Sequence, residues 1–572
     1  MTTTERMSTL GSGLAESVSS WDPFVLPDAG ILDVALHELY NRRAAVALRA
    51  LSPAALEEVL VINNAVESVF LGLREAERFD DLTRLEHRRR AFYANPDDDR
   101  TFEQLLRSVR FEGPHEGARR ELARQLRGKQ RVEHPHPPAQ RGGLPGVTAD
   151  FRAGQRRLID RLTTVPSEAP PSELYHGLVA TIGSPKTRRK LAKAWAEVAA
   201  EHYARLADSL LAAKESAPDV RTPAGYRETM TTLRNFVRLA EQDRHEFLRT
   251  LTDRDTTQSE TREAVQADLP HLVRTRIAAR RPATYDIVNA LSLVSGVADE
   301  LLGLTITFVP LDRGLYSCRM ESDGAHFTET RVDLNDRASK PYRSSYTQPI
   351  RNTATTKRWA VSAYSYISCR ALPVEGAEAM SFQNILSLLH ELGHAIQHAI
   401  PKHPLPSLSG LEGATSGRSE SFSLWLEKGA FSLEGLGERH GLASLSGARA
   451  ANAATQRLTA FSRGLYALIE LAFDYGTRAD LAALMENLDS LGSTYAKAEV
   501  AEAIGELADR FRDNSPGDNF RYIQAGIESA SAITVSRDRL RDVGRILARR
   551  PWQPGNDVLG RPAEYFRFYR RF

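Results

Sequence analysis

Two histidines four residues apart flank a glutamate in the segment His390-Glu391-Leu392-Gly393-His394. On an α-helix, residues four apart are rotated by about 40° and rise about 6 Å, so both imidazoles face the same point. Two neutral imidazoles at that separation can hold one tetrahedral zinc ion. Glu391 lies on the adjoining edge of the helix, where it can reach a metal-bound water without being a ligand. The spacing therefore predicts a zinc site with Glu391 as general base.

A catalytic zinc site also needs a third protein ligand and an open position for water. Two common spacings are absent. Gln397 and Ile400 stand where HExxHxxGxxH needs glycine and histidine, and Ala414 stands where a thermolysin-like site needs glutamate. We predict Glu420 as the third ligand. Glu412 is the alternative, but it lies among three glycines, where a mobile loop is the simpler interpretation.

Two predicted helices must position these side chains. The first begins near Ser381 and ends before Pro401, and it carries an apolar stripe at helical spacing: Ile385, Leu388, Leu389, Leu392, Ile396 and Ala399. The second is SGRSESFSLWLEKGAFS, with Ser419 or Ser421 near its start and Gly429 at its end. One face of this second helix combines residues at i, i+3, i+4 and i+7: Glu420, Ser423, Leu424 and Glu427.

On these motifs the chain resembles the thimet oligopeptidase and oligopeptidase F metallopeptidases, whose zinc helix reads HExGHxxH. Gly393 matches the family glycine, whereas Gln397 occupies the place of the last histidine and His398 falls one residue later. Glu420, Ser423 and Glu427 reproduce the pattern of the family's second helix, and RWAVSAYSYIS is similar to the strand before the zinc helix. The likeness is specific from about 358 to 430 and weaker back to about residue 150. His398 is expected to pack against a neighbouring element.

The resemblance implies a mostly helical, clam-like fold, with two lobes flanking a deep channel and a small β-sheet next to the zinc helix. It also implies cleavage of short unstructured peptides, because folded proteins would not enter such a channel. Zinc lowers the pKa of bound water from about 15.7 to about 7. Glu391 would take the proton of that water and return it to the leaving amine.

One part of the family pattern is missing. The family carries a late segment with a histidine and several tyrosines, one of which hydrogen-bonds the oxyanion, but here no histidine follows His440. Three explanations compete. Tyr522 or Arg521, in GDNFRYIQAG, supplies the donor from a shifted position; Tyr565 or Tyr569 folds back into the channel; or the enzyme acts on one dedicated small peptide or amide in a biosynthetic pathway. Tyr522 is our candidate catalytic residue. A non-enzymatic peptide-binding module is a further alternative, against which the intact base argues.

Bulk composition excludes several other classes of function. The 572 residues carry 75 basic and 73 acidic side chains, a formal charge of +2, which offers no net field for nucleic acid or anionic lipid. The longest apolar passage, 290–310, is interrupted by Asp299 and Glu300, which argues against a membrane span. The first residues lack the pattern of a secretory signal. Cys318 and Cys369 are far apart in sequence and are expected to be reduced, buried thiols. We therefore expect a cytoplasmic protein.

Composition along the chain predicts four segments. Residues 1–22 form a disordered tail, 23–130 an N-terminal helical region, 131–146 a linker or long loop rich in proline and glycine, and 147–572 the catalytic region. His134 and His136 are interpreted as part of the exposed loop. Short strands are expected between about 304 and 368, in LTITFVPL, HFTETRVDLN and RWAVSAYSYIS, and helices dominate from Ser381 onward.

Overall fold

The fold is taken from a computed structural model of the chain. It describes residues 26, 28–49, 53–93, 144–162, 170–216, 226–252, 263–264, 267–272, 275, 284–322, 324–337, 340, 345–355, 360–373, 378–400, 410–411, 416–433, 435–442, 445–490, 493–512, 519–533 and 561–571. The predicted tail 1–22, the histidines His134 and His136, and the alternative ligand Glu412 lie outside these residues.

The chain folds into two compact units. Each unit is assembled from stretches that are separate in the sequence. Among the described residues, unit 1 holds those before 94 and those of 284–441. Unit 2 holds those of 144–275, 442–533 and 561–571. The mostly helical fold with a small sheet is confirmed, whereas the channel between two lobes stays a prediction. The prediction of four consecutive segments did not include the return of the chain to unit 1 at residue 284.

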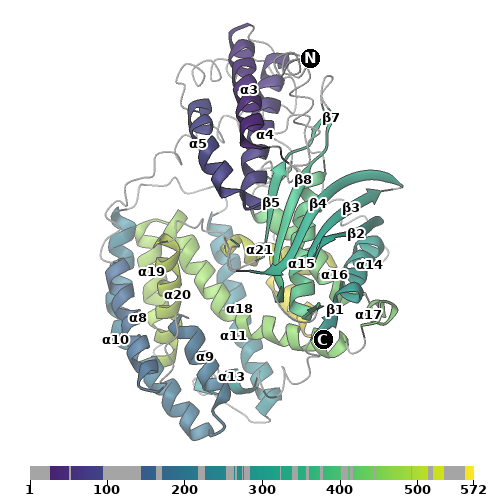
Figure 1. The fold of residues 1–572 in the computed structure, drawn as a ribbon. Helices are drawn as coiled ribbons and strands as arrows, with labels where there is room; N and C mark the ends of the chain where they lie inside the picture. Colours follow the sequence, from purple (N-terminus) through teal and green to yellow (C-terminus); the bar gives the residue numbers. More distant parts are fainter. Residues whose placement is uncertain are drawn as a thin grey trace, which may run out of the picture. The chain divides into compact units, whose positions relative to one another are not determined.

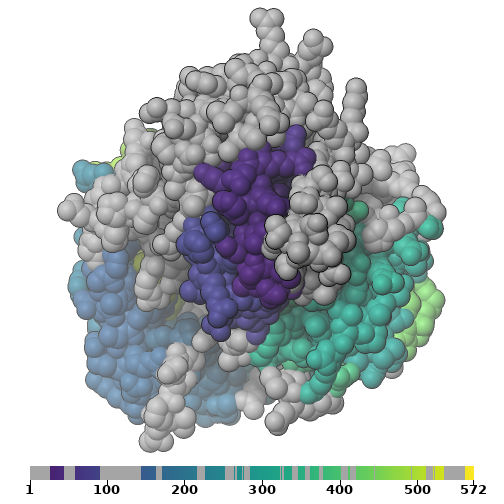
Figure 2. Space-filling view, turned by 45° about the horizontal axis from the view of Figure 1, so that its top comes forward, coloured from purple at the N-terminus to yellow at the C-terminus, as the bar shows by residue number. Residues whose placement is uncertain are grey.

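Three N-terminal helices open unit 1: α3 (Ala29–Arg49), α4 (Pro53–Glu75) and α5 (Phe79–Tyr93). Pro53 is the first residue of α4, a position where its missing N–H costs no hydrogen bond. The three helices share a buried apolar core that includes Leu32, Leu39, Val66, Val69, Leu73 and Leu85. In Figure 2 they form the purple surface beside the teal residues of the same unit.

A five-stranded sheet follows, in the order β2-β3-β4-β8-β5. Its strands are β2 (Leu304–Asp312), β3 (Leu315–Ser322), β4 (Ala325–Asp336), β8 (Tyr364–Pro373) and β5 (Tyr346–Arg351). Only the β4–β8 pair is parallel. The first two predicted strands are confirmed as β2 and β4. The described part of the third, RWAVSAYSYIS, is divided between a short strand at 360–361 and the start of β8. Strands β3 and β5 are additions. Pro349 in β5 suits the edge of a sheet, because proline cannot donate to a neighbouring strand. Two short pairs complete the strands: β1 (Tyr285–Asp286) with β9 (Ala379–Met380), and β6 (Ala354–Thr355) with β7 (Ala360–Val361).

Helices cover both faces of the sheet at strand β5. On one face lies α4 (Figure 1). There Leu71 packs with Tyr346, Ile350 and two tyrosines of β8. On the other face lies α15 (Phe382–Ala399), the predicted zinc helix, which packs against β5 and β8. Unit 1 also contains α14 (Ile287–Leu302), α16 (Ser416–Ser432) and the short α17 (Leu436–Arg439).

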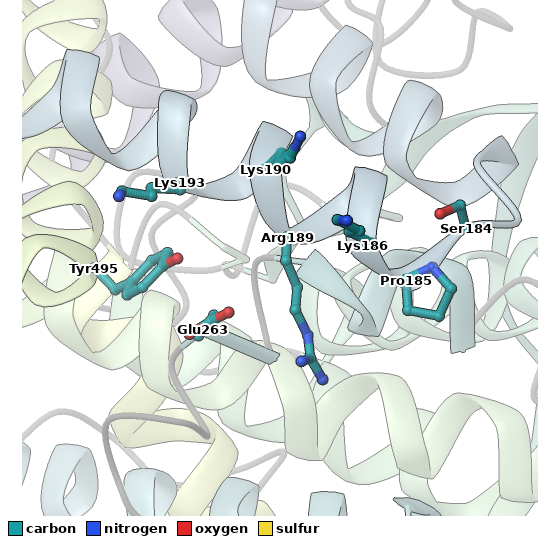
Figure 3. A pocket seen from close by; sticks show the side chains of 8 residues that line it. All are labelled: Ser184, Pro185, Lys186, Arg189, Lys190, Lys193, Glu263 and Tyr495. Atoms are coloured by element: carbon teal, nitrogen blue, oxygen red, sulfur yellow. The ribbon is translucent and has the colours of Figure 1, made fainter.

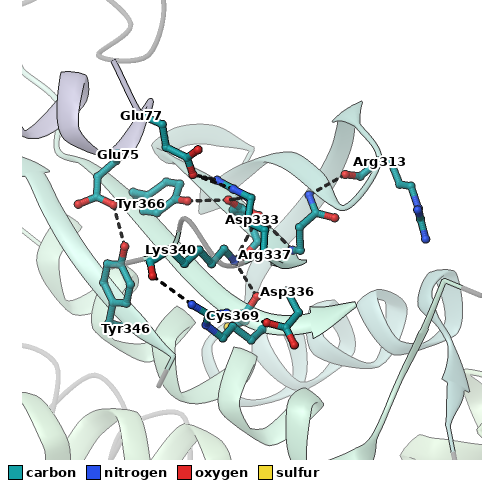
Figure 4. A network of polar contacts seen from close by, with 12 residues as sticks. Glu75, Glu77, Arg313, Asp333, Asp336, Arg337, Lys340, Tyr346, Tyr366 and Cys369 are labelled. Atoms are coloured by element: carbon teal, nitrogen blue, oxygen red, sulfur yellow. Dashed lines mark hydrogen bonds and ion pairs between the residues drawn. The ribbon is translucent and has the colours of Figure 1, made fainter. Parts of the chain in front are cut away.

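A buried polar network joins the parallel strands β4 and β8 (Figure 4). The Lys340 ammonium donates to the backbone oxygens of Asp333 and Cys369, each at 2.9 Å, and lies 3.3 Å from the Asp333 carboxylate. That carboxylate also accepts from the Tyr366 hydroxyl at 2.7 Å and from Arg337 at 2.6 Å. Burial raises the pKa of Asp333, but the neighbouring cations and the hydroxyl outweigh this and hold it below its usual value. The network therefore holds an ionised carboxylate inside the unit.

Unit 2 is helical throughout its described part. Its helices are α8 (Leu144–Asp160), α9 (Pro171–Thr181), α10 (Pro185–Ser216), α11 (Tyr226–Thr252), α13 (Leu269–Leu272), α18 (Leu445–Tyr475), α19 (Arg478–Asp489), α20 (Thr494–Arg512), α21 (Asn519–Ile533) and α23 (Pro562–Tyr569). Helix α10 packs along α20, and α11 along α18. Helix α8 begins at Leu144, so the last three residues of the predicted linker are helical.

Two further predictions concern individual segments. Cys318 and Cys369 are both buried, as expected, and burial raises the pKa of both thiols. Among the described helices, none combines the length and the apolar character that crossing a membrane requires. The apolar passage at 290–310 forms most of α14 and most of β2 instead.

Candidate metal centre

Helix α15 begins and ends as its sequence predicts. The Ser381 hydroxyl accepts from the Asn384 backbone N–H at 3.1 Å, which satisfies one of the free donors of the first turn. The apolar stripe is buried, with Ile385, Leu388, Leu389 and Leu392 fully enclosed. The helix ends at Ala399, just before Ile400 and Pro401. The stripe thus fixes the rotation of the helix and with it the direction of His390 and His394.

Gly393 allows α16 to approach α15 closely. A Cβ atom at this position would lie 2.7 Å from the Cα of Ser423, a separation that real side chains do not adopt. Because the two backbones meet there, Glu420, one turn before Ser423, faces the two histidines. The glycine of the motif is therefore explained by the close packing of α15 against α16.

The predicted end of the second helix at Gly429 is wrong. Helix α16 begins at Ser416 and continues through Gly429 to Ser432. A Cβ atom at Gly429 would collide with Leu301 of α14. This glycine serves the contact between α14 and α16 instead of capping the helix.

The side chains of His390, His394 and Glu420 come together at one point. The Nε2 atoms of the two histidines are 3.2 Å apart. Glu420 Oε2 lies 3.2 Å from His390 Nε2, and Glu420 Oε1 lies 3.6 Å from His394 Nε2. One donor atom from each residue falls within 4.8 Å of the others, so the group could hold a metal ion.

The chemistry of these donors fits zinc. Two imidazole nitrogens and one carboxylate form a ligand set used by catalytic zinc sites. Burial alone raises the pKa of Glu420, yet the two histidines lower it well below its usual range. Burial alone lowers the pKa of His390, yet Glu420 and Glu427 raise it to about 10. Both shifts arise from attraction between the imidazoles and the carboxylates that face them.

Glu427 lies behind the first histidine. Its Oε2 is 3.5 Å from His390 Nδ1, long for a hydrogen bond but close enough to orient the ring. A carboxylate on the second nitrogen of a metal-binding imidazole fixes its tautomer and raises its basicity. The sequence pattern placed Glu427 on the face of Glu420 but assigned it no role.

The predicted general base, Glu391, is buried and is held by the edge strand of the sheet. The Thr347 hydroxyl of β5 lies 2.8 Å from Glu391 Oε2 and 2.8 Å from the backbone oxygen of Glu391. Sequence reasoning missed Thr347. Its strand, YTQPIR, is short, polar and interrupted by proline, so nothing in it signalled a contact with the zinc helix.

His398 is not part of the donor group. It is fully buried, its Nε2 lies 2.8 Å from the Arg351 oxygen, and its Nδ1 accepts from the Leu411 N–H at 3.3 Å. The proton is therefore on Nε2. This histidine ties the end of α15 to the end of β5, in agreement with the expected packing role.

The candidate oxyanion donors lie in unit 2. Tyr565 and Tyr569 are buried in the core of that unit, where the Tyr565 ring lies 5.2 Å from that of Phe236 and 5.0 Å from that of Tyr569. The packing of these two tyrosines argues against a place in a channel. Tyr522 lies on α21 with 37% of its surface exposed, and its catalytic role stays a prediction. The side chain of Arg521 lies outside those described.

A hollow of about 650 Å³ lies at the start of α10 in unit 2 (Figure 3). Its basic lining residues, Lys186, Arg189, Lys190 and Lys193, are all exposed. Arg189 lies 3.7 Å from Asp268 and Lys193 lies 3.9 Å from Glu197, so neighbouring carboxylates already balance part of the charge. The hollow is a solvated basic helix face, and we assign no ligand to it.

No known family model matches the sequence. No curated protein matches it either. The likeness to the thimet oligopeptidase family therefore rests on the motif residues of α15 and α16.

Proposed function

We propose that this chain is a zinc-dependent metallopeptidase that hydrolyses peptide bonds of short unstructured peptides. The supporting observation is the convergence of His390, His394 and Glu420 on one point, with Glu391 next in sequence to the first of them. The alternative that these are incidental polar residues does not account for two buried histidines and a half-buried carboxylate whose nitrogen and oxygen atoms lie 3.2 to 3.6 Å apart.

Each residue has a defined task in the proposed reaction. His390, His394 and Glu420 would hold the ion, and Glu427 would orient the His390 ring. Bound zinc would supply an acidified water and polarise the scissile carbonyl. Glu391 would accept the proton of the water and deliver it to the leaving amine, so that one carboxylate serves as base and then as acid. The peptide substrate class rests on the family resemblance.

The proposal is tested by comparing wild type with Glu391→Gln on a mixed peptide pool read out by mass spectrometry. Glu391→Gln should keep one equivalent of zinc but lose about 100- to 10,000-fold in rate, because general base catalysis contributes that much. A chelator should abolish wild-type cleavage, and zinc should restore it. Glu438→Gln, an exposed glutamate of the same unit, is the matched control and should behave as wild type.

Failure of zinc-loaded wild type to cleave any peptide in a broad pool would rule out a general oligopeptidase. Unchanged peptide affinity in Glu391→Gln, with no turnover by wild type, would indicate a binding module instead.

A narrower enzyme with one dedicated small peptide or amide substrate is the second candidate. It is favoured by the absence of any histidine after His440. It is also favoured by the burial of Tyr565 and Tyr569, because buried tyrosines are poor candidates for the oxyanion donor. This candidate predicts inertness toward the peptide pool but zinc-dependent conversion of one compound in a small-molecule extract. The same conversion must be absent with Glu391→Gln.

A further inference from the structure

We propose that Thr347 is a positioning residue that fixes the carboxylate of Glu391 for proton transfer. This inference rests on the proposed function, since it assigns Thr347 to the same reaction. The carrying observation is the contact of its hydroxyl, at 2.8 Å, with Glu391 Oε2.

Strand β5 presents Thr347 to α15 from a fixed scaffold. Its neighbours Tyr346 and Gln348 point to the opposite face, where Tyr346 donates to Glu75 at 2.8 Å and Gln348 accepts from Arg74 at 2.6 Å. Thr347 itself is opposite Ile367 of β8 in the ladder. Because its neighbours are anchored to α4 and its backbone to β8, the hydroxyl has a defined position.

The hydroxyl has one proton and two acceptors within reach, both belonging to Glu391. Among the described residues, the Thr347 side chain has no other hydrogen-bond partner. Donation to Oε2 restrains the rotation of a long side chain and leaves the other carboxylate oxygen to receive the proton from water. Thr347 thus acts on the orientation of the base, not on the metal ligands.

The variant Thr347→Val removes the hydroxyl but keeps the branched shape that suits a strand. We expect kcat to fall about 10- to 100-fold, as misplacement of a reacting group by about 1 Å can cause, with KM within about twofold. Zinc content should be unchanged. Thr347→Ser restores the hydroxyl and should return kcat to within about threefold of wild type. Thr305→Val, an exposed threonine of β2 in the same sheet, is the matched control.

Crystal structures of the zinc-loaded proteins supply a readout that does not depend on turnover. In Thr347→Val the Glu391 carboxylate should adopt more than one orientation, while His390 and His394 stay in place. In Thr347→Ser it should adopt the wild-type orientation alone. Equal kcat in wild type and Thr347→Val, or a single unchanged Glu391 orientation in Thr347→Val, would overturn the proposal. If wild type cleaves no peptide, the peptidase proposal fails, and the orientation of Glu391 still decides the role of Thr347.

Discussion

At the scale of single residues, the candidate site is an arrangement of carboxylates around two imidazoles. Glu420 faces the Nε2 atoms, and Glu427 lies near Nδ1 of His390. Burial of His390, His394 and Glu427 makes an unpaired charge costly there. A cation bound between them would therefore be held by the direct donors and also by the carboxylate behind the first ring.

Glu427→Gln tests the contribution of that rear carboxylate. Loss of its charge should weaken zinc affinity about 10- to 100-fold, since partners behind metal ligands typically contribute that much. Competition with a chromophoric chelator measures the affinity. Glu420→Gln should lose far more, and Glu438→Gln should lose nothing. Unaltered affinity in Glu427→Gln would show that the 3.5 Å contact does not act on the metal.

The sequence predicted the residues whose spacing is set within one helix. His390, Glu391 and His394 follow from helical geometry alone, and Glu420 from a second local pattern. Thr347 could not be found in this way, because it reaches Glu391 through a fold that joins residues 44 positions apart. Its strand carries neither the alternation nor the β-branched run that indicates a strand from sequence.

At the scale of elements, the site depends on how closely α15 and α16 pack. A Cβ at Gly393 would meet the backbone of Ser423, and backbone cannot move aside as a flexible side chain can. The position of Glu420 therefore depends on Gly393, which is not itself one of the proposed metal ligands.

Gly393→Ala should separate the two helices. Alanine favours a helix over glycine by about 1 kcal/mol, but overpacking costs about 1–3 kcal/mol and should dominate. We expect lower stability in urea unfolding and at least about tenfold weaker zinc affinity. Gly177→Ala is the matched control, because a Cβ at Gly177 in α9 meets nothing within 4 Å; that variant should be neutral or slightly stabilised. Normal zinc affinity in Gly393→Ala would show that α16 tolerates the added methyl group.

The junction of β4 and β8 depends on a buried ion pair. Asp333→Asn leaves the Lys340 charge without its carboxylate, with both side chains almost fully enclosed. Breaking a buried pair on one side costs about 3–5 kcal/mol. Urea unfolding at neutral pH measures this loss. Asp336→Asn, whose carboxylate is 51% exposed, should change stability by about 1 kcal/mol or less.

The same pair predicts a pH dependence. The pKa of Asp333 is lowered in the folded state, so its contribution is complete above the unfolded value of about 3.9. It is lost as pH falls through the folded pKa. Wild type should therefore lose stability more steeply than Asp333→Asn below about pH 4, as followed by circular dichroism. Parallel acid curves for the two proteins would contradict this assignment.

At the scale of the whole molecule, all three proposed metal ligands lie in unit 1. Zinc bound at about 100 times its dissociation constant would stabilise the folded state by about 2.7 kcal/mol. Removal of zinc should therefore raise hydrogen exchange in α15 and α16 and leave α10 and α20 of unit 2 near their original rates. Mass spectrometry of the exchanged peptides, with zinc added back as the control, measures this. An equal loss of protection from hydrogen exchange in both units would contradict a stabilising effect of zinc that is confined to unit 1.

The division into two units shows where sequence reasoning reached its limit. Helical periodicity predicted helices in both units, including the start and end of α15. It could not predict that α4 packs with the edge strand of a sheet that begins at residue 304, because that pairing depends on contacts between distant segments. Composition along the chain indicates linkers. It carries no information about which segments on the two sides of a linker pack together in one unit.

The contact of α4 with β5 also sets an order of events during synthesis. Arg74 and Gln348 are 274 residues apart. At about 5–20 residues per second, roughly 14–55 s pass on the ribosome between the two. During that interval the Leu71 side of α4 has no strand to cover it, and about half of the other unit, including α8 to α11, emerges first. That apolar side therefore lacks its native cover until the edge strand has been made, and such surface favours aggregation of nascent chains.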